Sequence, residues 1–416
     1  MQVRWLRGDE FLAAAVFVAV AVAVTVAWEL SGDAVTDIPL YHTYGERIAA
    51  GAVPYRDFAF EYPPGALPAL VLPALVTDSL DAFRVVFAAE MALVGAIGVL
   101  VVGAALRRLG RADTERRVAL TAVAVLPVFL GGVILTRFDL VPATLVALAL
   151  LLVASGRERA AALVAGAGIA VKLYPALLVP LLAVSAWRRG GRRELGIVVA
   201  LAAAPVVLVY LPFLVADPDG VAHSIGRQID RPLQIESLGA GVLLALHHAA
   251  GMSLEWASGS GSQNLRGGAA NAVAVLQGVL QVAAVLLVWV AFGRGPASAE
   301  RIVRYAAASV VAFVALSKVL SPQFLVWLLF LVPLVGGLRS RASLSLFALA
   351  CALTAVWFPA RYWELVKEFD PVASWTVLAR GLTLLALLVV LIAPETSLVG
   401  VASRPAEPAS GAASRR

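Results

Sequence analysis

The stretch between residues 33 and 65 carries the densest set of side chains that could do acid–base chemistry. Asp37, Tyr41 and Tyr44 are spaced i, i+4 and i+7, so they share one face of the short surface helix that this stretch predicts. A carboxylate on that face could act as a general base by taking the proton of a hydroxyl group. Asp33 and Asp57 compete with Asp37 for this role. A solvated helix beside an interfacial aromatic belt would explain the same spacing without chemistry.

Ionisable side chains also interrupt the apolar runs further along the chain. Such a side chain costs about 2.5–3.5 kcal/mol at the centre of a membrane on insertion scales, and it usually faces the bundle interior or a water-filled cavity. Cations favour a phosphate ligand, and the candidates for phosphate binding are Arg137, Lys172, Arg227, Arg231 and Lys318. Further polar candidates for ligand binding are Tyr41, His42, Asp57, Glu61, Tyr62, Asp139, Glu236 and Gln323.

Several of these residues also have a plain structural explanation. Lys172 could snorkel to the membrane surface, and Asp139 could simply neutralise Arg137. The segment 227–236 could be a solvated loop, and His42 could be a surface residue.

The composition decides which kind of protein must position these side chains. Of 416 residues, 61% are hydrophobic and 14% are charged, against roughly 45–50% and 25% in an ordinary soluble domain. The apolar residues come in long runs such as residues 11–27 and 382–393. These numbers exclude a soluble enzyme and predict a multi-pass protein of the cell membrane, in contact with membrane lipids.

The charges set the topology. The net charge is +6, but the 33 Lys and Arg residues lie mostly in short gaps between apolar runs. That pattern is typical of the positive-inside rule and gives no reason to expect nucleic acid as a partner. The single cysteine, Cys351, excludes an intramolecular disulfide and a cysteine metal cluster. We see no metal-ligand cluster and no nucleotide-binding glycine motif, so we expect neither metal nor cofactor.

Placing the basic gaps in the cytoplasm predicts an all-α membrane domain over residues 1–393, with about 12 transmembrane helices. Both termini are then cytoplasmic, and residues 394–416 form a disordered tail. Outer loops cover 29–82, where the catalysis is expected, and 215–270; short interfacial helices are expected at 65–76 and 238–250. The expected spans are 11–27, 83–106, 118–135, 140–154, two halves of a hairpin within 160–187, 196–214, 271–292, 305–319, 324–338, 344–358 and 374–393.

The order of several short motifs resembles glycosyltransferase family 87. These are the outer-loop Asp37, the Gly-Ala-Val-Pro-Tyr-Arg-Asp at 51–57, the Glu-Tyr-Pro-Pro-Gly at 61–65, the Arg-Phe-Asp at 137–139 and the Lys-Leu-Tyr-Pro at 172–175. The resemblance covers roughly residues 12–338. Family members are GT-C-fold membrane enzymes that use polyprenyl-phosphate sugars, and they include bacterial α-mannosyltransferases.

The resemblance implies an inverting hexosyltransferase, with mannose as the first candidate sugar. The donor would be a polyprenyl-phosphate-linked sugar, the acceptor a lipid or a glycan, and the site would face the extracytoplasmic side. The family's acidic catalytic base in the first outer loop maps onto Asp37. A transporter or lipid flippase is the alternative from another class, and a non-catalytic partner in cell-envelope synthesis is a third.

Overall fold

The computed structural model describes residues 8–32 and 35–394, so Asp33 and the predicted tail after Pro394 lie outside the described residues. The first half contains α1 (Gly8–Leu30), α2 (Ile38–Ala49), η1 (Pro64–Ala66), α3 (Leu67–Ala74), α4 (Leu80–Arg108), α5 (Asp113–Val125), α6 (Pro127–Leu130), α7 (Val133–Thr136), α8 (Leu140–Ala154), α9 (Glu158–Val171), η2 (Tyr174–Leu178) and α10 (Val179–Ala216). The second half contains α11 (Pro218–Ile229), α12 (Leu238–Ala250), β1 (Glu255–Gly259), β2 (Ser262–Arg266), α13 (Gly268–Gly293), α14 (Ala299–Ala315), α15 (Phe324–Leu329), η3 (Val332–Leu334), η4 (Gly337–Arg339), α16 (Ser340–Trp357), α17 (Tyr362–Glu368) and α18 (Pro371–Ile392).

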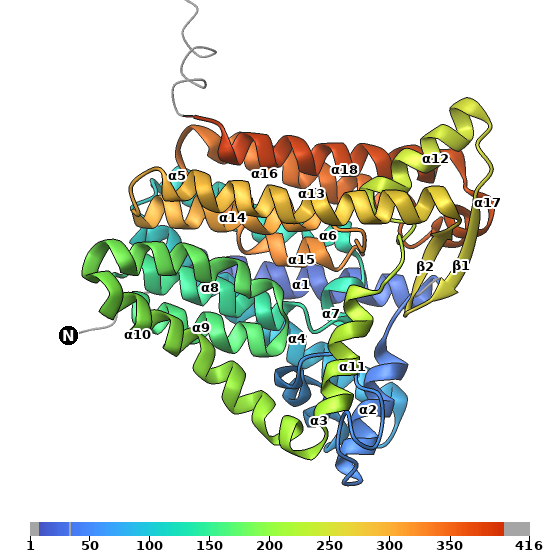
Figure 1. The fold of residues 1–416 in the computed structure, drawn as a ribbon, viewed down its shortest axis with the longest axis horizontal. Helices are drawn as coiled ribbons and strands as arrows, with labels where there is room; N and C mark the ends of the chain where they lie inside the picture. Colours follow the sequence, from blue (N-terminus) through green and yellow to red (C-terminus); the bar gives the residue numbers. More distant parts are fainter. Residues whose placement is uncertain (1–7, 33–34, 395–416) are drawn as a thin grey trace, which may run out of the picture.

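The long helices lie side by side as a bundle with two different ends (Figure 1). One end, which we call the loop end, carries α2, α3, α11, α12, α17 and the β1–β2 hairpin. The opposite end, which we call the arginine end, carries the basic gaps between the helices. The helix α1 begins and the helix α18 ends at the arginine end. The described elements run back and forth between these two ends.

Among the described residues, six helical segments are long and apolar enough to cross a membrane. They are Gly8–Leu30, Leu80–Arg108, Tyr174–Ala216, Gly268–Gly293, Gly337–Trp357 and Pro371–Ile392. This finding confirms an all-α membrane protein, whereas the count of 12 spans stays a prediction. The other predicted spans are helical but short or broken. Residues 118–135 are divided among α5, α6 and α7 because Pro127 interrupts the helix and Gly131 has a φ of 58°.

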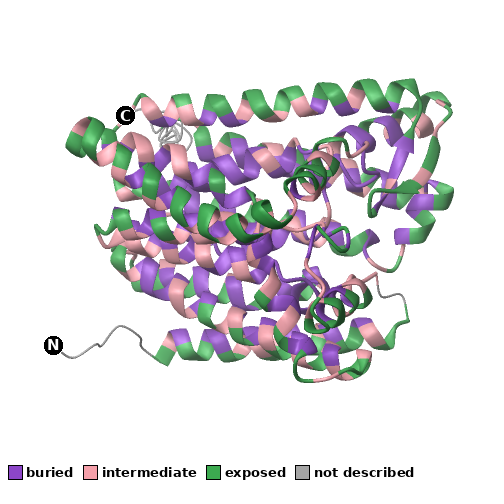
Figure 2. Cartoon of the chain, turned by 60° about the horizontal axis from the view of Figure 1, so that its bottom comes forward, coloured by how far each residue is buried: buried purple, intermediate pink, exposed green. Residues whose placement is uncertain are grey.

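Close packing of α1, α4 and α8 builds the centre of the bundle, where buried residues gather (Figure 2). A Cβ atom at Gly95 of α4 would lie 2.3 Å from the ring of Phe17. A Cβ atom at Gly98 would lie 2.2 Å from the ring of Phe330 and 2.7 Å from Thr144. Small residues let apolar helices approach closely, which is the main source of packing energy between helices in a membrane. This packing fixes the positions of the helix ends that carry the site.

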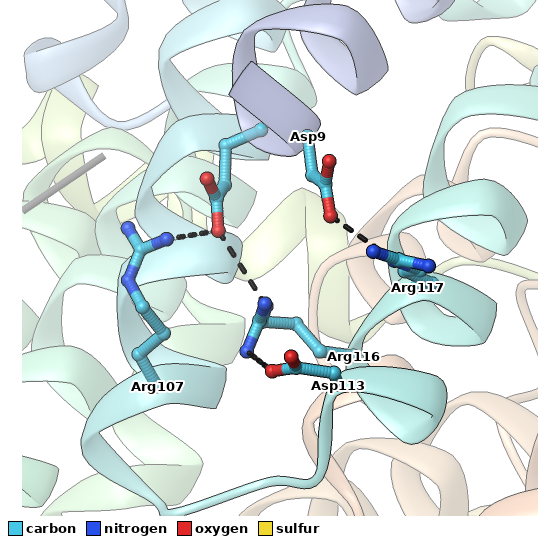
Figure 3. A network of polar contacts seen from close by, with 6 residues as sticks. Asp9, Arg107, Asp113, Arg116 and Arg117 are labelled. Atoms are coloured by element: carbon cyan, nitrogen blue, oxygen red, sulfur yellow. Dashed lines mark hydrogen bonds and ion pairs between the residues drawn. The ribbon is translucent and has the colours of Figure 1, made fainter. Parts of the chain in front are cut away.

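Ion pairs join the helices at the arginine end (Figure 3). The carboxylate of Glu10 is fully buried and pairs with Arg107 and with Arg116, whose Nε lies 3.7 Å away. Arg116 also binds Asp113 at 2.7 Å. These contacts tie α1, α4 and α5 together, so the cations of this end serve the fold as well as the topology.

The structure adds one short β-hairpin to the helical fold. The strands β1 and β2 form an antiparallel hairpin within residues 215–270, closed by Ser260 and Gly261 with φ values of 54° and 69°. Two successive residues with positive φ favour the tight turn of such a hairpin. The Ser-Gly-Ser-Gly-Ser run at 258–262 was the available signal, and our sequence reading did not use it.

Candidate active site

A cavity of about 1050 Å³ lies at the loop end, where the loops meet the helix ends. Its walls come from the loop before α3, the α7–α8 and α9–η2 junctions, α11, the hairpin tip, and the helices α13 to α15. The predicted site residues that line it are Asp37, Asp57, Glu61, Tyr62, Arg137, Lys172, Arg227, Arg231, Lys318 and Gln323. Residues that are distant in sequence therefore share one cavity with the carboxylate of the first loop.

Asp37 lies on the cavity wall immediately before the first turn of α2. Its side chain is 35% exposed and forms an ion pair with Arg137, whose side chain is 8% exposed. Arg137 follows α7 in an extended conformation and also donates to the carbonyl oxygen of Val35 at 3.4 Å. The carboxylate is thus partly exposed on the cavity side while a buried cation holds it in place.

Lys172 is held by a second buried acid. The helix α9 ends at Val171, and Lys172 takes an extended conformation before η2 begins. Its Nζ lies 2.6 Å from Oδ1 of Asp139, whose side chain is 1% exposed. The ammonium also lies 4.8 Å from the ring centroid of Phe138. Asp139 pairs with Lys172, whereas the sequence suggested Arg137 as the cation that Asp139 could neutralise.

Two cavity cations, Arg231 and Lys318, form no close ion pair among the described residues, although the charges of Glu61 and Glu236 raise the pKa of Arg231. Lys318 donates to the carbonyl oxygen of Ile229 at 2.9 Å. The Nε atom of Arg231 is buried without a hydrogen-bond partner in the part of the chain that the structure describes. Burial lowers the pKa of Arg231 below its ordinary value but leaves a guanidinium charged at neutral pH. The cavity therefore has spare positive charge on this side.

Two further cavity cations, Arg227 and Arg56, are each paired with a carboxylate. Arg227 lies 3.5 Å from Glu61, and Arg56 binds Asp57 at 2.9 Å. Asp57 also accepts the backbone N–H of Val53 at 2.7 Å. The hydrogen bond from Arg56 is the main cause that lowers the pKa of Asp57 to about 2. Asp57 thus stabilises the loop that contains it, and its carboxylate is a poor proton acceptor at neutral pH.

Four residues that we predicted at the site do not line the cavity. Tyr41 is buried against Phe87, and His42 packs on Phe83 while its Nε2 lies 3.1 Å from the carbonyl oxygen of Asp78. The other two are Asp139 and Glu236, both buried behind the wall. The type of a polar residue does not reveal whether its side chain points into a cavity or supports the cavity wall from behind.

The structure also adds cavity residues that sequence reasoning missed or set aside. Trp327, Gln281 and the hairpin tip at Ser260 line the wall, and so do His223 and Asp219 of α11. The side-chain amides of Gln277 and Gln281 within one apolar run were a signal that could have been used. The side chain of Asp217 accepts the N–H of Gly220 and so caps the N-terminus of α11.

The helix α11 covers part of the cavity and is bound to the first loop. Ser224 donates to the carbonyl oxygen of Phe60 at 2.7 Å, and Gln228 donates to that of Glu61 at 3.2 Å. A Cβ atom at Gly220 would lie 2.4 Å from the carbonyl oxygen of Tyr55, so only glycine permits this approach. The polar face of α11 therefore has a fixed position over the cavity.

Glu236 gives the protein a predicted pH dependence of stability. Burial raises the pKa of its carboxyl group from 4.5 to about 7, although Arg380 opposes the shift. A carboxyl group that binds its proton more tightly when folded stabilises the fold below pH 4.5, and this contribution is lost as the pH rises through 7. The expected loss is about 3 kcal/mol.

We expect the thermal midpoint of the purified protein in detergent to fall between pH 4.5 and 8 by more than that of Glu236→Gln. The amide keeps the hydrogen bond from Gln234 possible but cannot ionise. If the thermal midpoints of the two proteins change with pH by the same amount, Glu236 does not titrate in this range.

The fold and the cavity define a membrane protein whose polar site lies at one end of the bundle. The family model of glycosyltransferase family 87 matches residues 60–322, so the chain belongs to that family. It is a membrane glycosyltransferase, which acts on a sugar donor and an acceptor. No curated protein matches the chain closely. The matched range includes the five cations predicted to bind phosphate, while Asp37 precedes it.

Among the described residues, no group of three or more His, Cys, Asp or Glu side chains is placed to hold a metal ion.

Proposed function

We propose that this glycosyltransferase moves a hexose, with mannose as the first candidate, from a polyprenyl-phosphate-linked donor to a hydroxyl of a lipid or glycan. Asp37 takes the acceptor's proton while the acceptor oxygen forms its bond to the anomeric carbon. The bond between that carbon and the phosphate oxygen breaks, and polyprenyl phosphate leaves. The attack from the opposite face inverts the anomeric configuration.

The distribution of charge in the cavity is the observation that carries this proposal. Arg56, Arg137, Arg227 and Lys172 each face a carboxylate, which leaves Arg231 and Lys318. A sugar phosphodiester carries one negative charge, and the departing phosphate monoester carries almost two. Two spare cations therefore suit the leaving group better than the donor, and such differential binding accelerates the reaction.

The cavity also offers an apolar wall for a lipid chain. Val282 of α13 and Leu173 line it, although their side chains are 59% and 51% exposed. Phe313 and Phe324 extend the same wall. Residues that line a cavity and also lie on the outer surface mark an opening, here at the side of the bundle where lipid would lie. A donor with a long apolar chain fits this route.

Transfer of radiolabelled mannose from polyprenyl-phosphate-mannose in membranes that contain the protein tests the proposal. We expect labelled product in the extracted lipid or glycan fraction, and none with a nucleotide sugar alone after washing. Transfer from a polyprenyl-phosphate glucose or other hexose instead would keep the mechanism and replace the sugar. Transfer only from a nucleotide sugar would contradict the donor class.

We propose further that the loop end faces the extracytoplasmic side of the plasma membrane. In a Cys351→Ser background, we expect Ser258→Cys to react with a membrane-impermeant maleimide added to intact cells. Arg192→Cys, exposed at the arginine end, should react only after permeabilisation. The reverse pattern would place the site in the cytoplasm.

A further inference from the structure

Trp327 forms a central part of the cavity wall, although its sequence context gave no functional signal. Its ring lies between Tyr174 and Phe324, with centroid distances of 4.2 Å to each and interplanar angles of 4° and 18°. The side chain is buried but lines the cavity. Stacking on both faces fixes the plane of the indole, so the direction of its N–H group is fixed as well.

That N–H group points at the acid that holds Lys172. Nε1 of Trp327 donates to Oδ1 of Asp139 at 2.5 Å, and the Nζ atom of Lys172 lies 2.6 Å from the same oxygen. An ammonium group has three N–H donors. The structure shows one of them used by a side chain in the described part of the chain, which leaves donors for a ligand in the cavity.

We propose that Trp327 and Asp139 are positioning residues that hold the Lys172 ammonium at the cavity wall for an anionic ligand. That the ligand is the donor phosphate rests on the proposed function; the positioning itself does not. The three residues come from α15, the α7–α8 junction and the α9–η2 junction, so the arrangement couples three separate parts of the wall.

A lysine side chain has many rotamers along its four-carbon stem, so a fixed partner is needed to hold its ammonium group in one place. The carboxylate fixes Nζ, and the rigid indole fixes the carboxylate, so the ligand meets a preorganised cation. Burial lowers the pKa of Lys172, and Arg137 and Arg231 act in the same direction, whereas Asp139 opposes the shift. Asp139 therefore also keeps the amine protonated.

The first test uses Trp327→Phe, which keeps the ring stack but removes the N–H group. We expect the KM for the donor to rise about tenfold with kcat within about twofold, because one hydrogen bond to a charged group is lost. Asp139→Asn should cost more, and adding Trp327→Phe to it should have little further effect, because both act through Lys172. Trp375→Phe on the exposed side of α18 is the matched control. An unchanged KM in Trp327→Phe, or additive losses in the double variant, would overturn the proposal.

The second test needs no sugar transfer. The chain has three lysines, Lys172, Lys318 and Lys367, so acetylation by acetic anhydride can be followed at each by mass spectrometry. We expect Lys172 to react more slowly than the exposed Lys367, and to react at least about fivefold faster in Asp139→Asn and measurably faster in Trp327→Phe, at constant pH.

The two tests separate the possible failures. Faster acetylation in both variants together with no transfer by the wild-type protein would support the positioning and reject the donor class. Equal acetylation of Lys172 in the wild-type protein and in Asp139→Asn, with both proteins folded by their thermal midpoints, would overturn the positioning itself. Asp139→Glu, which keeps the charge, should acetylate more slowly than Asp139→Asn; if it does not, the carboxylate does not hold the amine.

Discussion

Replacing Asp37 by asparagine is expected to reduce sugar transfer about 10³-fold while the protein still inserts into the membrane and binds the donor. General-base catalysis contributes about 10²–10⁴-fold to a rate, and the amide cannot accept the proton. The measurement is kcat with a saturating polyprenyl-phosphate sugar. The KM for the donor should change far less, because the donor's phosphate is bound by other side chains.

Two control variants separate loss of the base from loss of structure. Asp37→Asn leaves the buried Arg137 without its carboxylate, so the thermal midpoint must be measured alongside. Asp37→Glu keeps the charge, and we expect it to retain partial activity because only the position of the oxygen changes. Asp81→Asn removes an exposed carboxylate at the same end of the bundle and should behave as the wild type.

The competing acids can be tested in the same assay. Asp57 is engaged by Arg56 and by the backbone of Val53, so Asp57→Asn should disturb its loop without removing a base. Asp33 lies outside the described residues, so its role is tested by measuring transfer with Asp33→Asn. Near-normal transfer by Asp37→Asn together with loss in either other variant would move the catalytic role to that residue.

The charge pattern predicted where the chain turns because basic gaps and apolar runs are local properties. The helix α12 spans the residues 238–250 expected to form an interfacial helix, and the chain turns at Lys172 as expected. The number of crossings could not be predicted equally well. Short or broken helices such as α7 and α15 are stabilised by their neighbours in the bundle, which a hydropathy pattern does not show.

The site itself was predictable by residue type but not by arrangement. Sequence reasoning identified Arg137 and Asp139 as one motif and Lys172 as another. Their actual partners are Asp37 for Arg137, and Lys172 with Trp327 for Asp139. These pairs join residues far apart in the chain, so spacing along one helix could not reveal them. Trp327 in particular looked like any other aromatic residue in an apolar run.

The second large effect is expected from the two cations without a carboxylate partner. Arg231→Gln should lower kcat/KM about 10²-fold, and the double variant with Lys318→Gln should fall further. Charge develops on the phosphate as it leaves, so the cations stabilise the transition state and the product more than the donor. The loss should therefore appear mainly in kcat, with a smaller rise in the KM for the donor.

Product inhibition provides the sharper measurement, because polyprenyl phosphate carries almost one more negative charge than the donor. We expect its inhibition constant to rise by a larger factor than the KM for the donor in Arg231→Gln, and Arg231→Lys to recover part of both. Arg266→Gln, at an exposed position on β2 away from the cavity, should leave both constants unchanged. If Arg231→Gln and the double variant keep the wild-type kcat and inhibition constant, Arg231 and Lys318 do not stabilise the leaving group.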